Sequence, residues 1–115
     1  VNPLTALSVS EAGRNIGQKD VWVYGYIVGI STSSSKSVFE PPFDSATNLL
    51  LASRATVTDR QSCISVELAK GDVRDALNLK DNPEMLGEQV FLFGDIVESY
   101  YGLPGLKSVT AYREK

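Results

Sequence analysis

The sequence predicts an all-β domain with a small helical content, and three observations lead to this class. Five segments rich in β-branched and aromatic residues have the character of strands. A helical segment lies between the third and fourth of them, and the first and fourth each carry a mid-strand glycine, which allows a strand to bend. Together these features predict a five-stranded OB-fold Greek-key barrel, with an N-terminal helix and a helical insert between strands 3 and 4. An immunoglobulin-like sandwich would need about seven strands and no such helix.

The chain of 115 residues is long enough for one domain with its own core, so we expect a single domain over 1–115, with the barrel over 20–113. It contains no histidine and one cysteine. These counts exclude a Ser-His-Asp triad, a Cys-His pair, a His-ligated metal site and an internal disulfide. The formal net charge of −3 is also unlike the basic footprint of a duplex-DNA-binding protein. We therefore expect no enzymatic activity, no metal and no cofactor.

The first helix is expected over 8–17 because of its N-terminal signal. Ser8 and Glu11 have the spacing of a capping box, in which each side chain accepts a hydrogen bond from the other residue's backbone N–H. Apolar residues then recur at helical spacing, and Gly17 can end the helix. Because so short a helix is unstable alone, we expect it to pack against the barrel.

The segment 21–30 gives the clearest strand signal in the chain. Side chains alternate between the two faces of a strand, so Val21 and Val23 would share the core face. The outer face would then carry three aromatic side chains, Trp22, Tyr24 and Tyr26. Gly25 has no side chain to pack and suggests a bend or bulge at mid-strand.

Two further strands and two loops are expected in the middle of the chain. The stretch 31–46 is irregular and long for a compact domain, and such loops are more often functional or mobile than inert. A strand is expected over 48–52, and a half-buried strand with alternating apolar residues over 63–68. The polar stretch 53–62 between them is predicted to be a second loop.

The helical insert is predicted from capping residues. Asp72 can cap a short helix whose apolar stripe includes Val73 and Leu77. The run 82–84, Asn-Pro-Glu, then has the character of a second helix N-terminus with proline at the first helical position. Carboxylates gather around this insert, and we interpret them as capping or solvated groups rather than as a calcium site, because no EF-hand spacing is present.

The last two strands are expected over 89–97 and 106–113, joined by a turn over 100–105 that contains two glycines and a proline. Gly94 is expected to bend the first of these strands. The lone Cys63 has no histidine partner and is interpreted as a small packed residue.

Several segments of the chain resemble a family of OB-fold domains. They are 21–29, 47–52, 64–68, 77–79, 82–83 and the Tyr-Gly-Leu-Pro-Gly-Leu-Lys turn at 101–107. The family occurs in secreted and surface-anchored bacterial proteins of unknown function and is related to the OB-like domain of some extracellular endonucleases. The resemblance implies an OB barrel, an extracellular or cell-envelope setting and often a companion domain, and it implies no catalytic residues. Because the chain begins with Val1, we expect a processed form or a cloned fragment, from which any signal or lipid-attachment segment would have been removed.

OB barrels commonly bind ligands across the outer face of strands two and three, between the loop after strand one and the loop before strand five. Aromatic side chains there can stack on bases or sugar rings, and basic ones can contact phosphates. The candidate ligand-binding residues are Trp22, Tyr24, Tyr26, Lys36, Phe39, Phe43, Arg54, Arg60, Tyr100, Tyr101 and Lys107. The alternative is that the rings cover the barrel and that the bases are ordinary surface charges.

Two functions remain open. The first is a non-catalytic module that binds single-stranded nucleic acid through outward aromatics and loop bases. The second is an accessory domain of a larger cell-envelope protein that interacts with another protein or a glycan. The acidic net charge favours the second function, and the aromatic first strand favours the first. No segment of 18 apolar residues is present, so we expect no direct membrane insertion.

Overall fold

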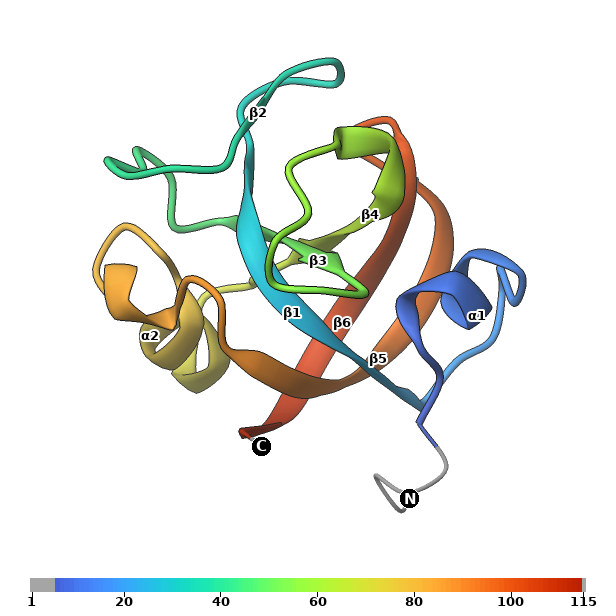
Figure 1. Ribbon diagram of the computed structural model, residues 1–115. Coiled ribbons are helices and arrows are strands. Elements are labelled where there is room, and N and C mark those ends of the chain that lie inside the picture. Colours follow the sequence, from blue (N-terminus) through green and yellow to red (C-terminus); the bar gives the residue numbers. More distant parts are fainter. Residues whose placement is uncertain (1–5, 115) are drawn as a thin grey trace.

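A computed structural model describes residues 6–114, which fold into a small β-barrel-like domain with two short helices at its rim (Figure 1). Its strands are β1 (Val21–Ser31), β2 (Ser37–Val38), β3 (Asn48–Ala52), β4 (Cys63–Glu67), β5 (Gln89–Tyr100) and β6 (Leu103–Glu114). The five long strands pair in the order β1–β3–β4–β6–β5, and β5 returns to β1, so they form a ring. Every pairing is antiparallel except that of β4 with β6. The mostly-β class predicted from the sequence is therefore confirmed.

Strand β1 closes the ring because it pairs with two strands in succession. Its first half, from Val21 to Tyr26, pairs with β5, and its second half, from Tyr26 onward, pairs with β3. The bend expected at Gly25 is wrong in position, since pairing is regular there and the register shift lies between Ile27 and Gly29. Gly25 instead permits a close approach of other segments: a Cβ atom there would lie 2.8 Å from a methyl group of Val9.

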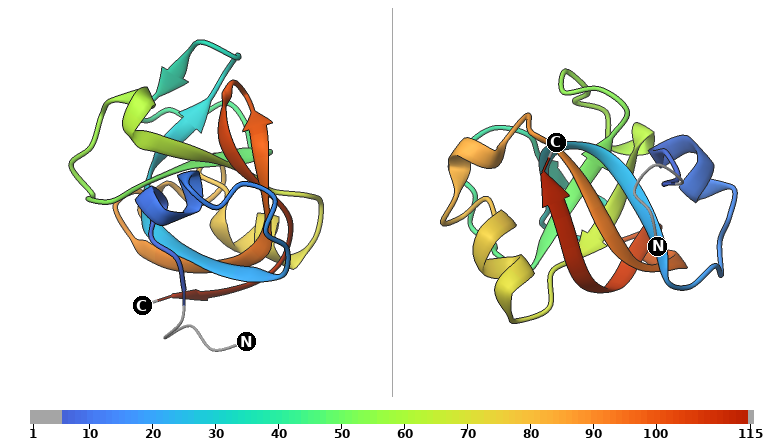
Figure 2. Two further views of the ribbon diagram at one scale, coloured as in Figure 1. Left: turned by 90° about the vertical axis from the view of Figure 1, so that its right-hand side faces the viewer. Right: turned by 90° about the horizontal axis from the view of Figure 1, so that it is seen from below.

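The N-terminal helix α1 (Val9–Gly13) packs against β1 and β4 (Figure 2). The capping box is confirmed, with the Ser8 hydroxyl and the Glu11 carboxylate each accepting the other's backbone N–H. The helix ends four residues before the expected Gly17. The reason is that the following backbone bonds to β5 instead: the Gly17 N–H donates to the Ile96 carbonyl at 2.9 Å, and the Ile96 N–H donates to Gln18.

The stretch 31–46, expected to be an irregular loop, contains a small strand. Ser37 and Val38 form β2 and pair with Ser31 and Ile30 at the end of β1. The described part of the chain therefore forms six strands rather than the predicted five, although β2 extends the ring without belonging to it.

The helical insert consists of α2 (Asp72–Leu77) and one 3₁₀ turn, η3 (Pro83–Met85), and it lies on the opposite side of the barrel from α1 (Figure 1, Figure 2). The apolar stripe is confirmed, since Val73 and Leu77 are buried. The capping role of Asp72 is wrong: Gly71 occupies the cap position, and Asp72 is the first helical residue. Gly71 has a φ of 147°, which favours glycine, and this sets where the helix begins.

The β5–β6 hairpin is longer than expected and its turn is shorter. Tyr101 and Gly102 alone form the turn, and both have a positive φ, as in a two-residue type I′ turn. The bend at Gly94 is confirmed, because the register with β6 shifts between Phe93 and Asp95. A Cβ at Gly94 would lie 2.6 Å from the backbone oxygen of Lys107, so only glycine fits this close crossing.

The apolar residues form two separate clusters. The larger one fills the inside of the ring, where alternate residues of β1, β3, β4 and β5 meet, among them Val23, Ile27, Leu49, Leu51, Ile64, Val66, Val90 and Leu92. The smaller one, which we call the outer cluster, lies on the opposite face of β1, β3 and β4 and contains Val28, Leu50, Ala52, Cys63 and Leu103. The sheet is thus buried on both faces at this side of the barrel.

Candidate functional site

The outer face of β3 and β4, where the sequence suggested a ligand-binding surface, is covered by the protein's own loops. All five residues of β3 and the first four of β4 are buried. Tyr26, Phe39 and Val57 pack against the outer cluster from β1 and from the two neighbouring loops. In this structure a ligand therefore has no access to the strands beneath these loops.

Arg60 joins the loops around this face. Its Nη1 donates to the Ser31 hydroxyl at 2.9 Å, the Ser37 hydroxyl at 2.6 Å and the Lys36 carbonyl at 3.3 Å. Its Nη2 donates to the Ser34 carbonyl at 3.1 Å and to the carbonyl of Tyr101. A guanidinium with this many internal acceptors is not available to a phosphate backbone, so the structure gives Arg60 a role in holding loops together.

The two loop phenylalanines also pack within the protein. Phe43 is 5% exposed and belongs to the inner core, although it was a candidate for ligand contact. Phe39 is half-buried against the outer cluster. Both rings bury apolar area that a polar loop would otherwise leave open, which is the commoner use of an aromatic side chain.

Three of the candidate residues form a cluster at the β5–β6 turn, which we call the turn cluster: Tyr100, Tyr101 and Lys107. The two tyrosine rings meet edge to face, with centroids 4.8 Å apart, and the Lys107 ammonium lies 5.1 Å from the Tyr100 ring centroid. Burial, with the neighbouring Tyr101 second, raises the pKa of Tyr100 to about 12. Lys36 and Arg54 are exposed, in the 31–46 stretch and on the loop after β3 respectively.

The outward side chains of β1 and β5 form a second aromatic surface, which we call the aromatic face: Trp22, Tyr24, Phe91 and Phe93. Trp22 is paired with Phe93 and Tyr24 with Phe91, with ring centroids 5.4 and 5.5 Å apart. The guanidinium carbon of Arg113, from β6, lies 5.5 Å from the Trp22 ring. The sequence left open whether the three β1 rings are exposed: Trp22 is 6% exposed because its neighbours cover it, whereas Tyr24 and Tyr26 are half-buried.

Phe91 and Phe93 were not among the candidate residues, yet a signal for them was present in the sequence. Val90 and Leu92 face the inner core, so the alternating phenylalanines must face outward. A strand such as β5, which is apolar on both faces, indicates that its outer face packs against other residues or binds a ligand. If β5 had been paired with the aromatic strand β1, the aromatic face could have been predicted.

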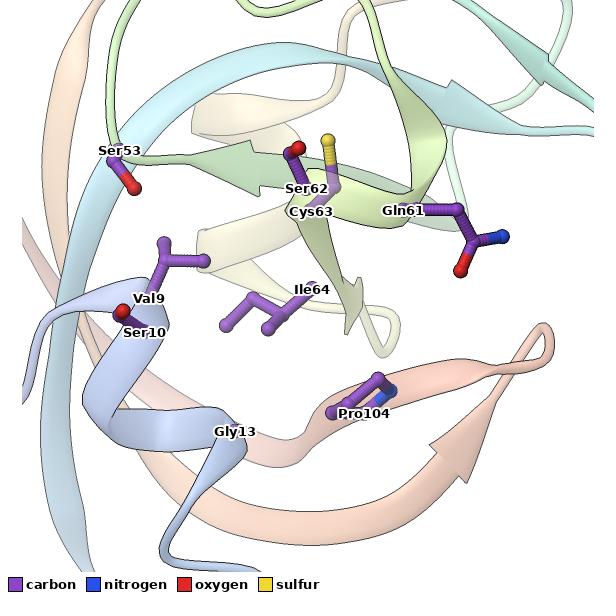
Figure 3. Close-up of a pocket in the computed structure, with 9 residues that line it drawn as sticks. All are labelled: Val9, Ser10, Gly13, Ser53, Gln61, Ser62, Cys63, Ile64 and Pro104. Atoms are coloured by element: carbon purple, nitrogen blue, oxygen red, sulfur yellow. The ribbon is translucent and has the colours of Figure 1, made fainter.

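Beside α1, the molecule has a groove of about 360 Å³ (Figure 3). Val9, Ile64 and Pro104 contribute apolar surface to it from α1, β4 and β6, and uncharged polar residues complete the lining: Ser10, Ser53, Gln61 and Ser62. Gly13 and Cys63 line it as well. A smaller cleft of about 100 Å³ lies on the other side of Val9 and includes Tyr24, Tyr26 and Gln89.

The two hollows are lined by apolar and uncharged polar residues. Neither has a charged side chain in its lining. Burial, with the nearby Asp59 carboxylate second, raises the pKa of the Cys63 thiol to about 11, so the thiolate needed for nucleophilic attack is disfavoured. Among residues 6–114, no group of three metal-ligating side chains is assembled. Over the same span, no helix has the length and apolar character needed to cross a membrane.

One comparison with known proteins gives a match. A family model described as a domain of unknown function, DUF6359, covers residues 7–115. No curated protein and no solved structure matches the chain.

Proposed function

The chain belongs to the DUF6359 family of domains of unknown function, and we propose that it is a non-catalytic binding module built on an OB-type barrel. The pairing order of the five long strands supports this, because the third and fifth pair in parallel and the fourth returns to the first. The helical insert between the third and fourth long strands, β4 and β5, gives further support.

The proposed ligand is a neutral glycan, bound on the aromatic face. The observation that carries this proposal is the pair of cross-strand ring contacts, Trp22 with Phe93 and Tyr24 with Phe91, on the outside of the barrel. A sugar ring presents a face of C–H groups that packs well against aromatic rings, while its hydroxyls need uncharged polar partners nearby. Tyr24, Tyr26 and Gln89 supply both kinds of contact at one end of this face.

The charges near the aromatic face do not favour a polyanion. Within residues 6–114, its one cationic ring contact is that of Arg113 with Trp22. Asp95 lies further along β5, where its carboxylate accepts the backbone N–H of Asp20. Strong phosphate-driven binding needs about six to ten basic contacts, and the net charge of the chain is −3.

The test is calorimetric titration with neutral oligosaccharides of β-1,4-linked glucose, xylose and N-acetylglucosamine. We expect binding to at least one series, and a loss of affinity of about tenfold or more in Tyr24→Ala and Phe91→Ala, because each removes a stacking ring. Tyr101→Ala, on the turn cluster, is the matched control and should leave the affinity unchanged. If none of the series binds, or if Tyr101→Ala weakens binding as much as Tyr24→Ala, the proposal is wrong.

The turn cluster supports a second candidate function, the binding of single-stranded nucleic acid. The favouring observation is the Tyr100–Tyr101 ring pair with Lys107 above it, beside the loop that holds Lys36. Titration of labelled oligo-dT and oligo-rU at about 50 and 200 mM salt tests it, since phosphate contacts weaken steeply with salt. Here Tyr101→Ala and Lys107→Ala should reduce binding while Tyr24→Ala does not. Absence of binding at both salt concentrations would reject this function.

The resemblance to secreted and surface-anchored domains supports a setting in the cell envelope or outside the cell, with the module as an accessory part of a larger protein. Fractionation of the source cells, with an antibody against this domain, tests the setting. Recovery of the protein in the cytosolic fraction would reject it.

A further inference from the structure

The two hollows beside α1 are neighbours and adjoin the aromatic face. The groove and the cleft share Val9 and Ser53 in their linings, and the cleft shares Tyr24 with the aromatic face. Aromatic face, cleft and groove therefore follow one another across the surface of β1, α1, β4 and β6. We call this sequence of surfaces the track.

Several polar side chains that line the groove and the cleft are uncharged and lack internal partners. Among the described residues, the side chains of Ser10, Ser53, Gln61 and Gln89 form no hydrogen bond within the protein. Other polar groups nearby are committed, since the Ser62 hydroxyl donates to the Asp59 carboxylate at 3.1 Å. The free groups are hydroxyls and amides, which both donate and accept, as the hydroxyls of a sugar do.

The dimensions of the hollows indicate a ligand longer than one unit. The cleft, at about 100 Å³, is smaller than the few hundred Å³ typical of an independent ligand pocket, so it would be filled by part of a ligand that continues on either side. The groove, at about 360 Å³, has space for a further part of the same chain. Val9, Ile64 and Pro104 would meet its apolar face, as Figure 3 shows for their positions around the groove.

We propose that the track binds an internal stretch of a linear neutral polysaccharide, with one unit on the aromatic face at Tyr24 and Phe91, the next against the cleft, and the following units along the groove. This inference rests on the glycan-binding function proposed above and extends it, because it requires affinity to rise with chain length. Ser53 lines both hollows and lies where the chain would pass from one to the other.

A linear sugar fits the track better than an extended peptide. Peptides that lie on sheets commonly add a strand to a free edge. The edge of the first half of β1 that faces away from β5 is already occupied, because the Leu7 N–H donates to the Trp22 carbonyl and the Tyr24 N–H donates to the Leu7 carbonyl. The lining offers no charge with which to select an acidic or a basic peptide. Binding of an uncharged peptide instead of a sugar is one outcome that the experiment can reveal.

The experiment measures affinity against chain length. Calorimetry with oligosaccharides of two to six units, from the three neutral series above, should give at least about tenfold tighter binding for the longest than for the shortest. Ser53→Trp places a bulky ring where the cleft meets the groove, so the six-unit chain should bind no more tightly than the two-unit chain in this variant. Thr56→Trp, in the same loop and outside both linings, should change neither affinity.

A milder variant guards against misfolding as the explanation. Gln61→Ala removes one exposed amide and should weaken only the longer chains, by about threefold, with an unchanged thermal melt. Equal affinities for two-unit and six-unit chains in the unmodified protein would overturn the track and leave the glycan-binding function standing. Absence of binding to all three series would overturn both, and so would binding of uncharged peptides alone.

Discussion

The guanidinium of Arg60 donates a hydrogen bond to the backbone carbonyl of Tyr101, 41 residues later in the chain. The same guanidinium reaches the hairpin of β1 and β2 through Ser31 and Ser37. One side chain therefore ties three connecting segments together above the outer cluster, through neutral oxygen acceptors only.

We expect Arg60→Ala to lower the free energy of unfolding by about 2–3 kcal/mol, because hydrogen bonds from a charged donor are lost and their acceptors are left partly buried. Arg60→Lys should recover little of this loss, since one ammonium cannot reach acceptors spread around a planar fork. Urea denaturation measures both. Arg54→Ala, on the same loop but exposed, is the control and should change stability by less than about 0.5 kcal/mol. Equal effects of Arg60→Ala and Arg54→Ala on stability would contradict the role of Arg60 in holding the loops together.

Gly25 is expected to tolerate no side chain. A Cβ atom there would lie 2.8 Å from Val9 Cγ2 and 3.0 Å from the Ala52 carbonyl oxygen, so Gly25→Ala should destabilise by about 1–3 kcal/mol. Gly13→Ala is the control, because no atom from another part of the structure lies within 4 Å of its Cβ position. The double variant Val9→Ala with Gly25→Ala should lose less stability than the sum of the two single variants, since the closest clashing atom is gone. Strictly additive losses in thermal melts would show that Val9 is not the obstacle.

The thiol of Cys63 should react slowly and make stability fall at alkaline pH. Burial raises its pKa from 9.0 to about 11 in the folded protein, so the neutral thiol is favoured by folding. The contribution of the thiol to the free energy of unfolding is fully present below pH 9. It is lost as the pH rises toward 11, because the Cys63 thiol ionises at a lower pH in the unfolded chain than in the folded protein. We expect Cys63→Ala to flatten the decline of stability over this range, and Ellman's reagent at pH 8 to label the folded protein far more slowly than the urea-unfolded one. Equally fast labelling of both states would show the site to be open.

Trp22 is the only tryptophan of the chain and reports on the aromatic face. Since it is 6% exposed, its emission should be blue-shifted and weakly quenched by acrylamide. Phe93→Ala removes the ring 5.4 Å away and should shift the emission to the red and increase quenching. Phe39→Ala, which disturbs the outer cluster instead, should leave the emission of the folded protein unchanged. A strongly quenched tryptophan in the unmodified protein would contradict the packing of this face.

Local patterns were enough to predict most of the barrel. The strand predicted over 48–52 has the bounds of β3, and that predicted over 21–30 is one residue shorter than β1, since runs of β-branched and aromatic residues mark them. The strand over 89–97 was predicted too short because Glu98 and Ser99 are exposed and polar, although the hairpin continues through them. The helix end at Gly17 was wrong because a backbone bond to Ile96, far along the chain, decides it.

The candidate site was less predictable, because its character depends on contacts between distant segments. Trp22 contacts Phe93 and Arg113 from β5 and β6, which no pattern within β1 could reveal. Arg60 has the sequence character of an ordinary loop base, and only its five internal acceptors show otherwise. The groove and the cleft beside α1 likewise depend on how this helix lies against β1 and β4.

The parallel pairing of β4 with β6 joins only Ser65 to Gly105 and Val66 to Leu106, and it is the shortest pairing in the ring. The barrel therefore has a natural seam, and transient opening of the native state should begin there, with backbone amides along it exchanging with solvent before those of β1 and β5. The groove borders this seam through Ile64 and Pro104. A ligand bound in the groove would contact both β4 and β6. Ligand binding would therefore oppose the opening of the barrel between these two strands.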